Sequence, residues 1–226
     1  MAAIGEAEAR YEQGDMAGAA ALARSLNSAE GFALAARATL VQAAYLSPAG
    51  AKQALFELAA ADAAAALARD PERVDAHLQL AMALGHLAEL EDPLSAHVGG
   101  YAREGKALLE RALALDPGNG WAPALLGIWH LRIVARAGDA LAERLYGARR
   151  ETGVALCSQA MAGPRRALAL QHGCAVSLIE LDPERFADTA ERTLATIEEA
   201  KARDVADSLV QAEAARLLDG LKSEGR

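Results

Sequence analysis

Ala66-Leu67-Ala68-Arg69-Asp70-Pro71 recurs 46 residues later as Ala112-Leu113-Ala114-Leu115-Asp116-Pro117, and this pair of segments decides the fold. Alanine and leucine favour helix, whereas proline disfavours helical geometry in the residue before it and suits the first turn of the next helix. Each segment therefore predicts the end of one helix and the start of another. A weaker copy, Ala160-Met161-Ala162-Gly163-Pro164, follows after another 47 residues.

A quasi-repeat near 46 residues is long enough for two helices, so the chain is expected to fold into helical hairpins. The expected helices cover residues 2–13, 16–26, 29–46, 49–69, 73–90, 93–115, 120–137, 139–162, 164–181 and 183–203, with a capping helix over 204–222. Gly99-Gly100 is a point where the helix over 93–115 kinks or breaks. The polar face of the capping helix (Asp204, Asp207, Gln211, Glu213) is expected to meet solvent, as the end of a repeat array requires.

Small residues stand at equivalent places in the two clearest repeats. Ala81 and Gly127 each follow the proline of their junction by ten residues. Glycine is costly in the middle of a helix, so we interpret Gly127 as a site where a partner helix approaches closely.

These junctions resemble those of the tetratricopeptide repeat (TPR) family. Gly14-Asp15 with Ala19 and Ala23 is similar to the middle of a repeat, and Ala112-Leu113 with Asp116-Pro117 and then Leu126-Gly127 is similar to an end followed by a start. The period near 46 residues is longer than that family's, and an array of the HEAT type is the alternative. The resemblance implies an all-α, right-handed superhelix of about five antiparallel hairpins, whose concave groove is lined by the first helix of each pair and binds segments of other proteins.

Composition and charge exclude several classes of function. The net charge is −8, which disfavours nucleic-acid binding because phosphate contacts need clustered basic residues. Neither a signal peptide nor a run of apolar residues long enough to span a membrane occurs. We therefore expect a cytoplasmic protein with one domain over residues 1–222 and a disordered tail over 223–226. The Ala, Leu and Arg bias suggests a bacterial, GC-rich source.

No set of side chains in the sequence points to chemistry. The five histidines lack metal-ligand spacing, the glycine pairs follow no strand, and the carboxylate clusters are interpreted as solvated helix surface. Cys157 and Cys174 are too few for a disulfide framework and are interpreted as reduced, inert core residues. The sequence thus predicts that the protein is not an enzyme and carries neither cofactor nor metal.

Two features remain as candidates for binding. The positions expected to face the groove are mostly apolar, which argues against a carboxylate clamp of lysine and asparagine, and the candidates are Leu78, Met82, His86, Trp121, Ile128, Arg132 and Arg136. Trp121 and Trp129 lie near one helical stripe, where they either floor an apolar pocket or pack the core between repeats. Seven arginines between Arg132 and Arg166 either converge on an anion or form surface ion pairs with Asp139, Glu143 and Glu151.

The sequence therefore predicts a non-enzymatic interaction or scaffold module that binds a partner protein or peptide in its groove. The alternative is a ligand-binding accessory protein of a solute transport system, in which an apolar pore with an arginine rim would suit an organic acid. An alanine-rich helix face also allows a homo-oligomer.

Overall fold

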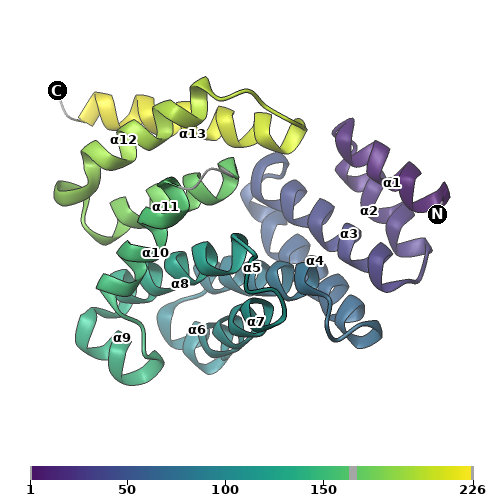
Figure 1. Ribbon diagram of the computed structural model, residues 1–226, viewed down its shortest axis with the longest axis horizontal. Coiled ribbons are helices and arrows are strands. Elements are labelled where there is room, and N and C mark those ends of the chain that lie inside the picture. Colours follow the sequence, from purple (N-terminus) through teal and green to yellow (C-terminus); the bar gives the residue numbers. More distant parts are fainter. Residues whose placement is uncertain (1, 163–166, 225–226) are drawn as a thin grey trace. The chain divides into compact units, whose positions relative to one another are not determined.

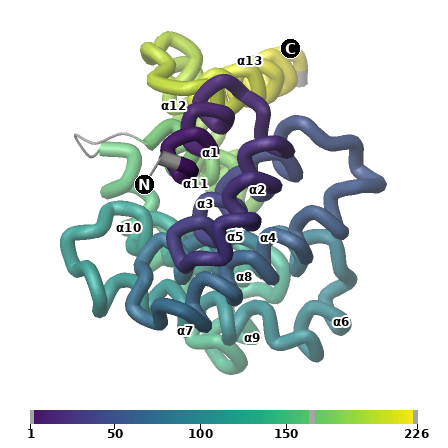
Figure 2. The backbone as a smooth tube through the Cα atoms, turned by 90° about the vertical axis from the view of Figure 1, so that its right-hand side faces the viewer, coloured from purple at the N-terminus to yellow at the C-terminus, as the bar shows by residue number. Residues whose placement is uncertain are grey.

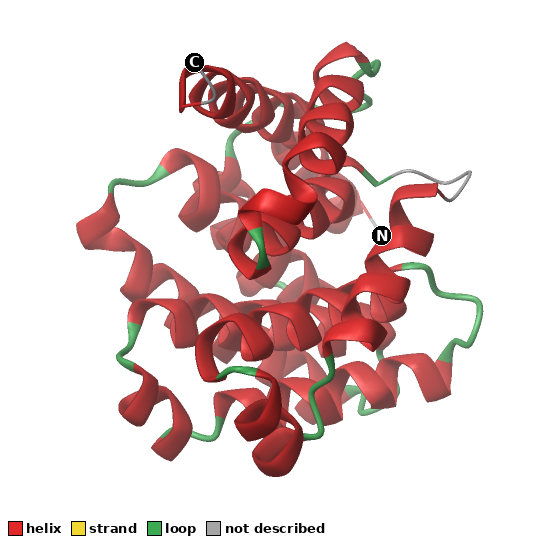
Figure 3. Ribbon diagram, turned by 90° about the vertical axis from the view of Figure 1, so that its left-hand side faces the viewer, coloured by secondary structure: helices red, strands yellow, loops and turns green. Residues whose placement is uncertain are grey.

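The computed structural model describes residues 2–162 and 167–224, and every regular element in these residues is a helix (Figure 3). In chain order the elements are α1 (Ala2–Glu12), α2 (Met16–Ser25), α3 (Ala29–Val41), the π-helix η1 (Gln42–Leu46), α4 (Ala49–Arg69), α5 (Val74–Leu90), α6 (Pro93–Val98), α7 (Tyr101–Leu115), α8 (Trp121–Ala137), α9 (Asp139–Tyr146), α10 (Arg150–Ala162), α11 (Leu168–Leu181), α12 (Pro183–Glu199) and α13 (Val205–Glu224). The all-α class predicted from the sequence is confirmed.

Helix contacts divide the chain into two compact units, residues 1–119 (unit 1) and residues 120–226 (unit 2). In unit 1, α1 pairs with α2, α3 with α4 and α5 with α7, and α2 and α4 pack on the first helix of the next pair (Figure 2). In unit 2, α8 pairs with α10 and α11 with α12, and α13 packs on α11 and α12 (Figure 1). These pairings confirm the five predicted hairpins and the final helix. The single domain predicted for residues 1–222 stays a prediction.

The two Asp-Pro junctions end their helices where the sequence predicted. Helix α4 ends at Arg69 and α7 at Leu115, one residue before the aspartate in each case. The aspartate N–H groups still donate to the last turn, from Asp70 to Ala66 O at 2.9 Å and from Asp116 to Ala112 O at 3.0 Å. The chain then leaves the helix because the residue before a proline disfavours helical geometry.

Glycines divide two of the predicted helices. The helix expected over 93–115 breaks at Gly99-Gly100, where Gly100 has φ +73°. The helix expected over 139–162 is wrong, because α9 ends at Tyr146 and α10 starts only at Arg150. Gly147, at φ +68°, takes the left-handed conformation, and its N–H closes the last turn of α9 on Glu143 O.

The C-terminal boundaries also differ from those predicted. The helix over 183–203 is wrong at its end, since α12 stops at Glu199 and Ala200 is extended at ψ 151°. The predicted start of the helix over 164–181 and the last two residues of the predicted tail lie outside the described residues. Residues 223 and 224, also expected in that tail, belong to α13.

Alanine builds much of the core of unit 1. One cluster combines Ala36, Ala43, Ala59, Ala63 and Ala83 with Leu40, Phe56, Leu80, Leu84 and Leu87. Alanines at helix contacts shorten the distance between helix axes, and their burial supplies apolar area at little cost in side-chain entropy. The comparable cluster of unit 2 joins Leu131, Cys157, Cys174, Leu178 and Phe186.

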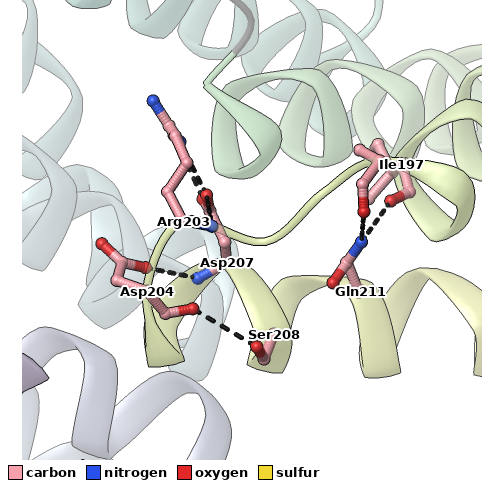
Figure 4. Close-up of polar contacts among 7 residues, drawn as sticks. Ile197, Arg203, Asp204, Asp207, Ser208 and Gln211 are labelled. Atoms are coloured by element: carbon pink, nitrogen blue, oxygen red, sulfur yellow. Dashed lines mark hydrogen bonds and ion pairs between the residues drawn. The ribbon is translucent and has the colours of Figure 1, made fainter. Parts of the chain in front are cut away.

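The expectation that Asp207 of the capping helix meets solvent is wrong. Its side chain is buried and accepts hydrogen bonds from Arg203 Nε at 2.7 Å and from Arg203 N at 3.1 Å (Figure 4). Asp204 caps α13 by accepting from the N–H of Asp207 at 2.8 Å. Gln211 donates to Ile197 O at 3.0 Å and therefore ties α13 to the end of α12.

Candidate functional site

One stripe of side chains on α8 carries four of the residues that the sequence proposed for binding. Trp121, Leu125, Ile128, Arg132 and Arg136 recur at helical spacing and so share one face of α8. Trp121 is 36% exposed, the three central residues are half-buried, and Arg136 is exposed. The stripe is therefore apolar at its start and cationic at its end.

Glycines bring the neighbouring helices close to α8. A Cβ on Gly173 of α11 would lie 2.8 Å from Ile128 Cδ1, and a Cβ on Gly127 would lie 2.9 Å from Leu156 Cβ of α10. A side chain at Gly127 would press on Leu156 Cβ and on the Cys157 backbone, so this approach needs glycine, whereas one at Gly173 would only displace the tip of the Ile128 side chain. The predicted role of Gly127 is confirmed. We call the surface formed by the α8 stripe and the adjoining side of α11 the α8/α11 face.

Arg132 is held on this face by α11. Its Nε donates to Ser177 Oγ at 3.2 Å and lies 3.9 Å from Glu180 Oε2. Burial lowers the pKa of the Arg132 guanidinium; Glu180 raises it and the neighbouring Arg136 lowers it. An arginine pKa starts so high that the group stays charged at neutral pH. A cation fixed in a half-buried position is suited to bind a carboxylate through two parallel hydrogen bonds.

His172 of α11 belongs to the same neighbourhood, and sequence reasoning missed it. Burial lowers the pKa of His172; Glu213 of α13 raises it and Arg132 lowers it. Its Nε2 is buried without a hydrogen-bond partner in the described part of the chain. The sequence held no signal for this placement, because Arg132, His172 and Glu213 lie on three different helices.

The three candidates on α5 serve packing within unit 1. Leu78 is buried, and Met82 packs against the alanine-rich core. The His86 ring stacks on Phe56 of α4 at 4.5 Å between centroids, and its Nδ1 lies 3.1 Å from Glu89 Oε2. Their contribution to partner binding stays a prediction.

The two tryptophans have different environments. Trp129 packs against the cluster that contains Val134, Ala142 and Ala148, and its ring meets His130 edge-on at 5.0 Å. Trp121 instead lies at the exposed end of the α8 stripe. Trp129 thus follows the core-packing interpretation, whereas Trp121 does not, and the apolar pocket that the two were to floor together stays a prediction.

The arginine-rich segment divides in a similar way. Arg150 forms two hydrogen bonds to Asp139, at 3.0 and 2.9 Å, and Arg149 pairs with Glu143 at 2.9 Å. These two arginines follow the ion-pair interpretation, whereas Arg132 and Arg136 lie on the α8/α11 face. Residues 165 and 166 lie outside the described residues.

Cys157 of α10 and Cys174 of α11 form a disulfide, with their Cα atoms 5.3 Å apart. Both are completely buried, as expected for core residues. The expectation that they are reduced is wrong. The sequence allowed the two cysteines to face each other on adjacent helices, and the packing of α10 on α11 brings their sulfur atoms together.

Two further features bear on function. No group of three metal-ligating side chains occurs in residues 2–162 and 167–224. None of the described helices combines the length and the apolar character that crossing a bilayer requires.

The hairpin pairs and the glycine-mediated contacts define a TPR-like helical-repeat protein. The crystal structure of a thermophilic TPR protein from Thermus thermophilus superposes with a TM-score of 0.63 over 94% of this chain and 96% of that one, at 19% identity. The TPR-like resemblance is thereby confirmed at the level of the fold. No curated protein gives a significant sequence match.

The family is identified by sequence. Residues 4–139 match the family described as regulator of microtubule dynamics protein 1-3. That match covers more than half of the chain, which therefore belongs to this family. It ends before α11, so the family match contains Arg132 but not the Ser177 that holds it.

Proposed function

We propose that this chain is a non-enzymatic interaction module that binds a partner segment on the α8/α11 face of unit 2. Proteins with a TPR-like fold generally act as interaction scaffolds, because stacked hairpins present extended surfaces. The observation that carries the proposal is the half-buried Arg132 guanidinium, oriented by Ser177 on α11 and followed one turn later by the exposed Arg136.

The chemistry of the face specifies the kind of segment that suits it. Trp121 and Ile128 offer apolar area, and a tryptophan at a protein surface is a frequent anchor in interfaces. Arg132 and Arg136 offer two cationic groups further along the same stripe. A segment with an apolar side chain and a nearby carboxylate matches both ends. Arg136 follows Arg132 by four residues, so the two cations are neighbours on one face of the helix.

Selection from a random peptide library displayed on phage tests the proposal. We expect wild-type protein to enrich peptides that pair an acidic residue with an apolar one. Arg132→Glu should lower the affinity of those peptides by about tenfold or more, since a hydrogen bond to a charged group contributes roughly 1.5–3 kcal/mol. Arg136→Glu should have a smaller effect in the same direction, because its side chain is exposed.

Arg149→Glu is the matched control, because the Arg149 side chain is exposed and its ion pair with Glu143 lies at the surface. It should leave the affinity within about twofold. Circular dichroism melts show that each variant is folded before binding is compared. Enrichment of peptides without acidic residues, or equal binding by wild type and Arg132→Glu, would refute the proposal.

Two further measurements distinguish peptide binding from related functions. Thermal stabilisation by small organic acids, with no peptide enriched, would instead support the transport-accessory alternative. Co-sedimentation with polymerised tubulin tests whether the action in the family's name extends to this chain.

A further inference from the structure

The disulfide lies at the junction of the three helices that form and support the α8/α11 face. Cys157 belongs to α10 and Cys174 to α11. A Cβ on Gly127 of α8 would lie 3.0 Å from Cys157 N and 3.2 Å from its Sγ. The disulfide therefore joins α10 to α11 beside Gly127, where α8 approaches α10 most closely among the contacts described above.

Cys174 also lies close to the residues of α11 that contact α8, including Ser177. The preceding residue, Gly173, is the one that lies against Ile128. Ser177, which accepts the hydrogen bond from Arg132, follows Cys174 by three residues, or nearly one helical turn. A shift of α11 along or around its axis would move both contacts together.

We propose that the Cys157–Cys174 disulfide is the positioning element of the α8/α11 face, so that the oxidised protein binds and the reduced protein binds weakly. This inference rests on the proposed function of that face. The bond fixes α11 against α10, α10 is fixed against α8 at Gly127, and α11 in turn fixes Arg132 through Ser177.

The redox step is a thiol–disulfide exchange. Oxidation removes two electrons and two protons from the thiols of Cys157 and Cys174, and a small-molecule or protein disulfide accepts them and becomes two thiols. Reduction by a dithiol reverses each change. Both sulfur atoms are buried, so a thiolate reaches them only when α10 and α11 separate. Folded protein should therefore exchange slowly, and the bond should form as unit 2 folds.

The structure predicts the size of the effect on stability. Closing a loop between residues 17 apart should lower the unfolding equilibrium constant of unit 2 by about two orders of magnitude. We expect hydrogen exchange in α11 to accelerate on reduction, whereas α3 and α4 of unit 1 serve as an internal control.

The experiment compares oxidised wild type, dithiol-reduced wild type and Cys157→Ala/Cys174→Ala. Alkylation in denaturant without reductant, followed by intact mass, should show no free thiol in the oxidised protein. The affinity of a peptide selected on oxidised wild type should fall at least fivefold in both the reduced protein and the double variant. The reduced wild type keeps both sulfur atoms in the core, so it separates loss of the bond from loss of packing.

The outcomes distinguish the two proposals. Two alkylated cysteines in the oxidised sample overturn the inference, and so does unchanged peptide affinity in the reduced protein. The binding function survives either result. A third outcome is that no peptide can be selected, although hydrogen exchange in α11 accelerates on reduction. This outcome overturns the proposed binding function and supports only the statement that the disulfide positions α11.

Discussion

Removing Arg24 should destabilise unit 1 more than removing any surface arginine. Arg24 of α2 donates from Nε to both carboxylate oxygens of Asp62 on α4, at 2.8 and 2.9 Å, and from Nη2 to Thr39 Oγ1 on α3 at 2.9 Å. The Asp62 side chain is only 4% exposed. Arg24→Met keeps the aliphatic length but leaves this carboxyl group without its cation.

The magnitude follows from the burial of the partner. Breaking a buried ion pair by removing one member costs about 3–5 kcal/mol, and we expect about 3 kcal/mol because Arg24 itself keeps 29% of its side chain exposed. For a unit of this size that loss should lower the melting temperature by about 10 °C. Replacing both members, in Arg24→Met/Asp62→Leu, should restore most of the loss because no charge is then buried alone.

The pH dependence of the free energy of unfolding provides an independent test of the role of Asp62. Burial raises the pKa of Asp62, and the hydrogen bond and charge of Arg24 oppose that rise. A raised folded-state pKa means that this group's stabilising contribution is complete below its unfolded pKa and is lost as pH rises through the folded value. In Arg24→Met the burial is unopposed and the pKa of Asp62 rises further, so the variant gains more stability than the wild type as the pH is lowered, and its deficit should shrink toward pH 4, roughly the unfolded value.

Urea unfolding of the full chain, followed by circular dichroism, measures these differences. Arg10→Met is the matched control, since Arg10 pairs with Glu6 at 3.3 Å on an exposed surface and should cost less than about 0.5 kcal/mol. The reasoning fails if Arg24→Met costs less than about 1 kcal/mol. It also fails if the double variant is less stable than the single one.

Three further predictions concern single residues. Gly127→Val should cost about 1–3 kcal/mol in urea unfolding, because its side chain would meet the backbone N of Cys157. Gly85→Ala should stabilise the chain by about 0.5–1 kcal/mol in the same assay, since Gly85 lies inside α5 and a Cβ there would meet no described atom within 4 Å beyond its neighbours in the helix; a loss would contradict this. Burial opposes ionisation of Asp207, but hydrogen bonds from Arg203 outweigh it and lower its pKa. Its contribution is present above the unfolded pKa and lost as pH falls through the folded one, so the deficit of Asp207→Asn should stay constant down to about pH 4 and shrink as the pH is lowered further.

The buried disulfide bears on where the protein is located. Disulfides persist mainly in oxidising compartments and are rare in the cytosol. The bond between Cys157 and Cys174 therefore weighs against the predicted cytoplasmic location, which stays a prediction. Alkylation of the protein in freshly lysed native cells would measure the redox state of the pair directly.

The local sequence was enough to predict the helices and many of the residues at which they end. Runs of alanine and leucine predict helix by intrinsic propensity, and Asp70-Pro71 and Asp116-Pro117 stop it by steric exclusion. Both effects act within one or two turns, so a sequence shows them directly. Gly147 was missed because an isolated glycine is tolerated in a helix, and the sequence did not show that this one takes a positive φ at the end of α9.

The candidate site depended on tertiary structure. The sequence alone determined that Trp121, Ile128, Arg132 and Arg136 share a helical stripe, because helical periodicity fixes the spacing of one face. Only the packing of α11 and α10 on α8 decided that Ser177 holds Arg132, that the half-buried His172 lies in the same neighbourhood and that the two cysteines bond. These partners lie far apart along the chain, and their contacts depend on helix crossings set by small residues, glycine and alanine, which many sequences share.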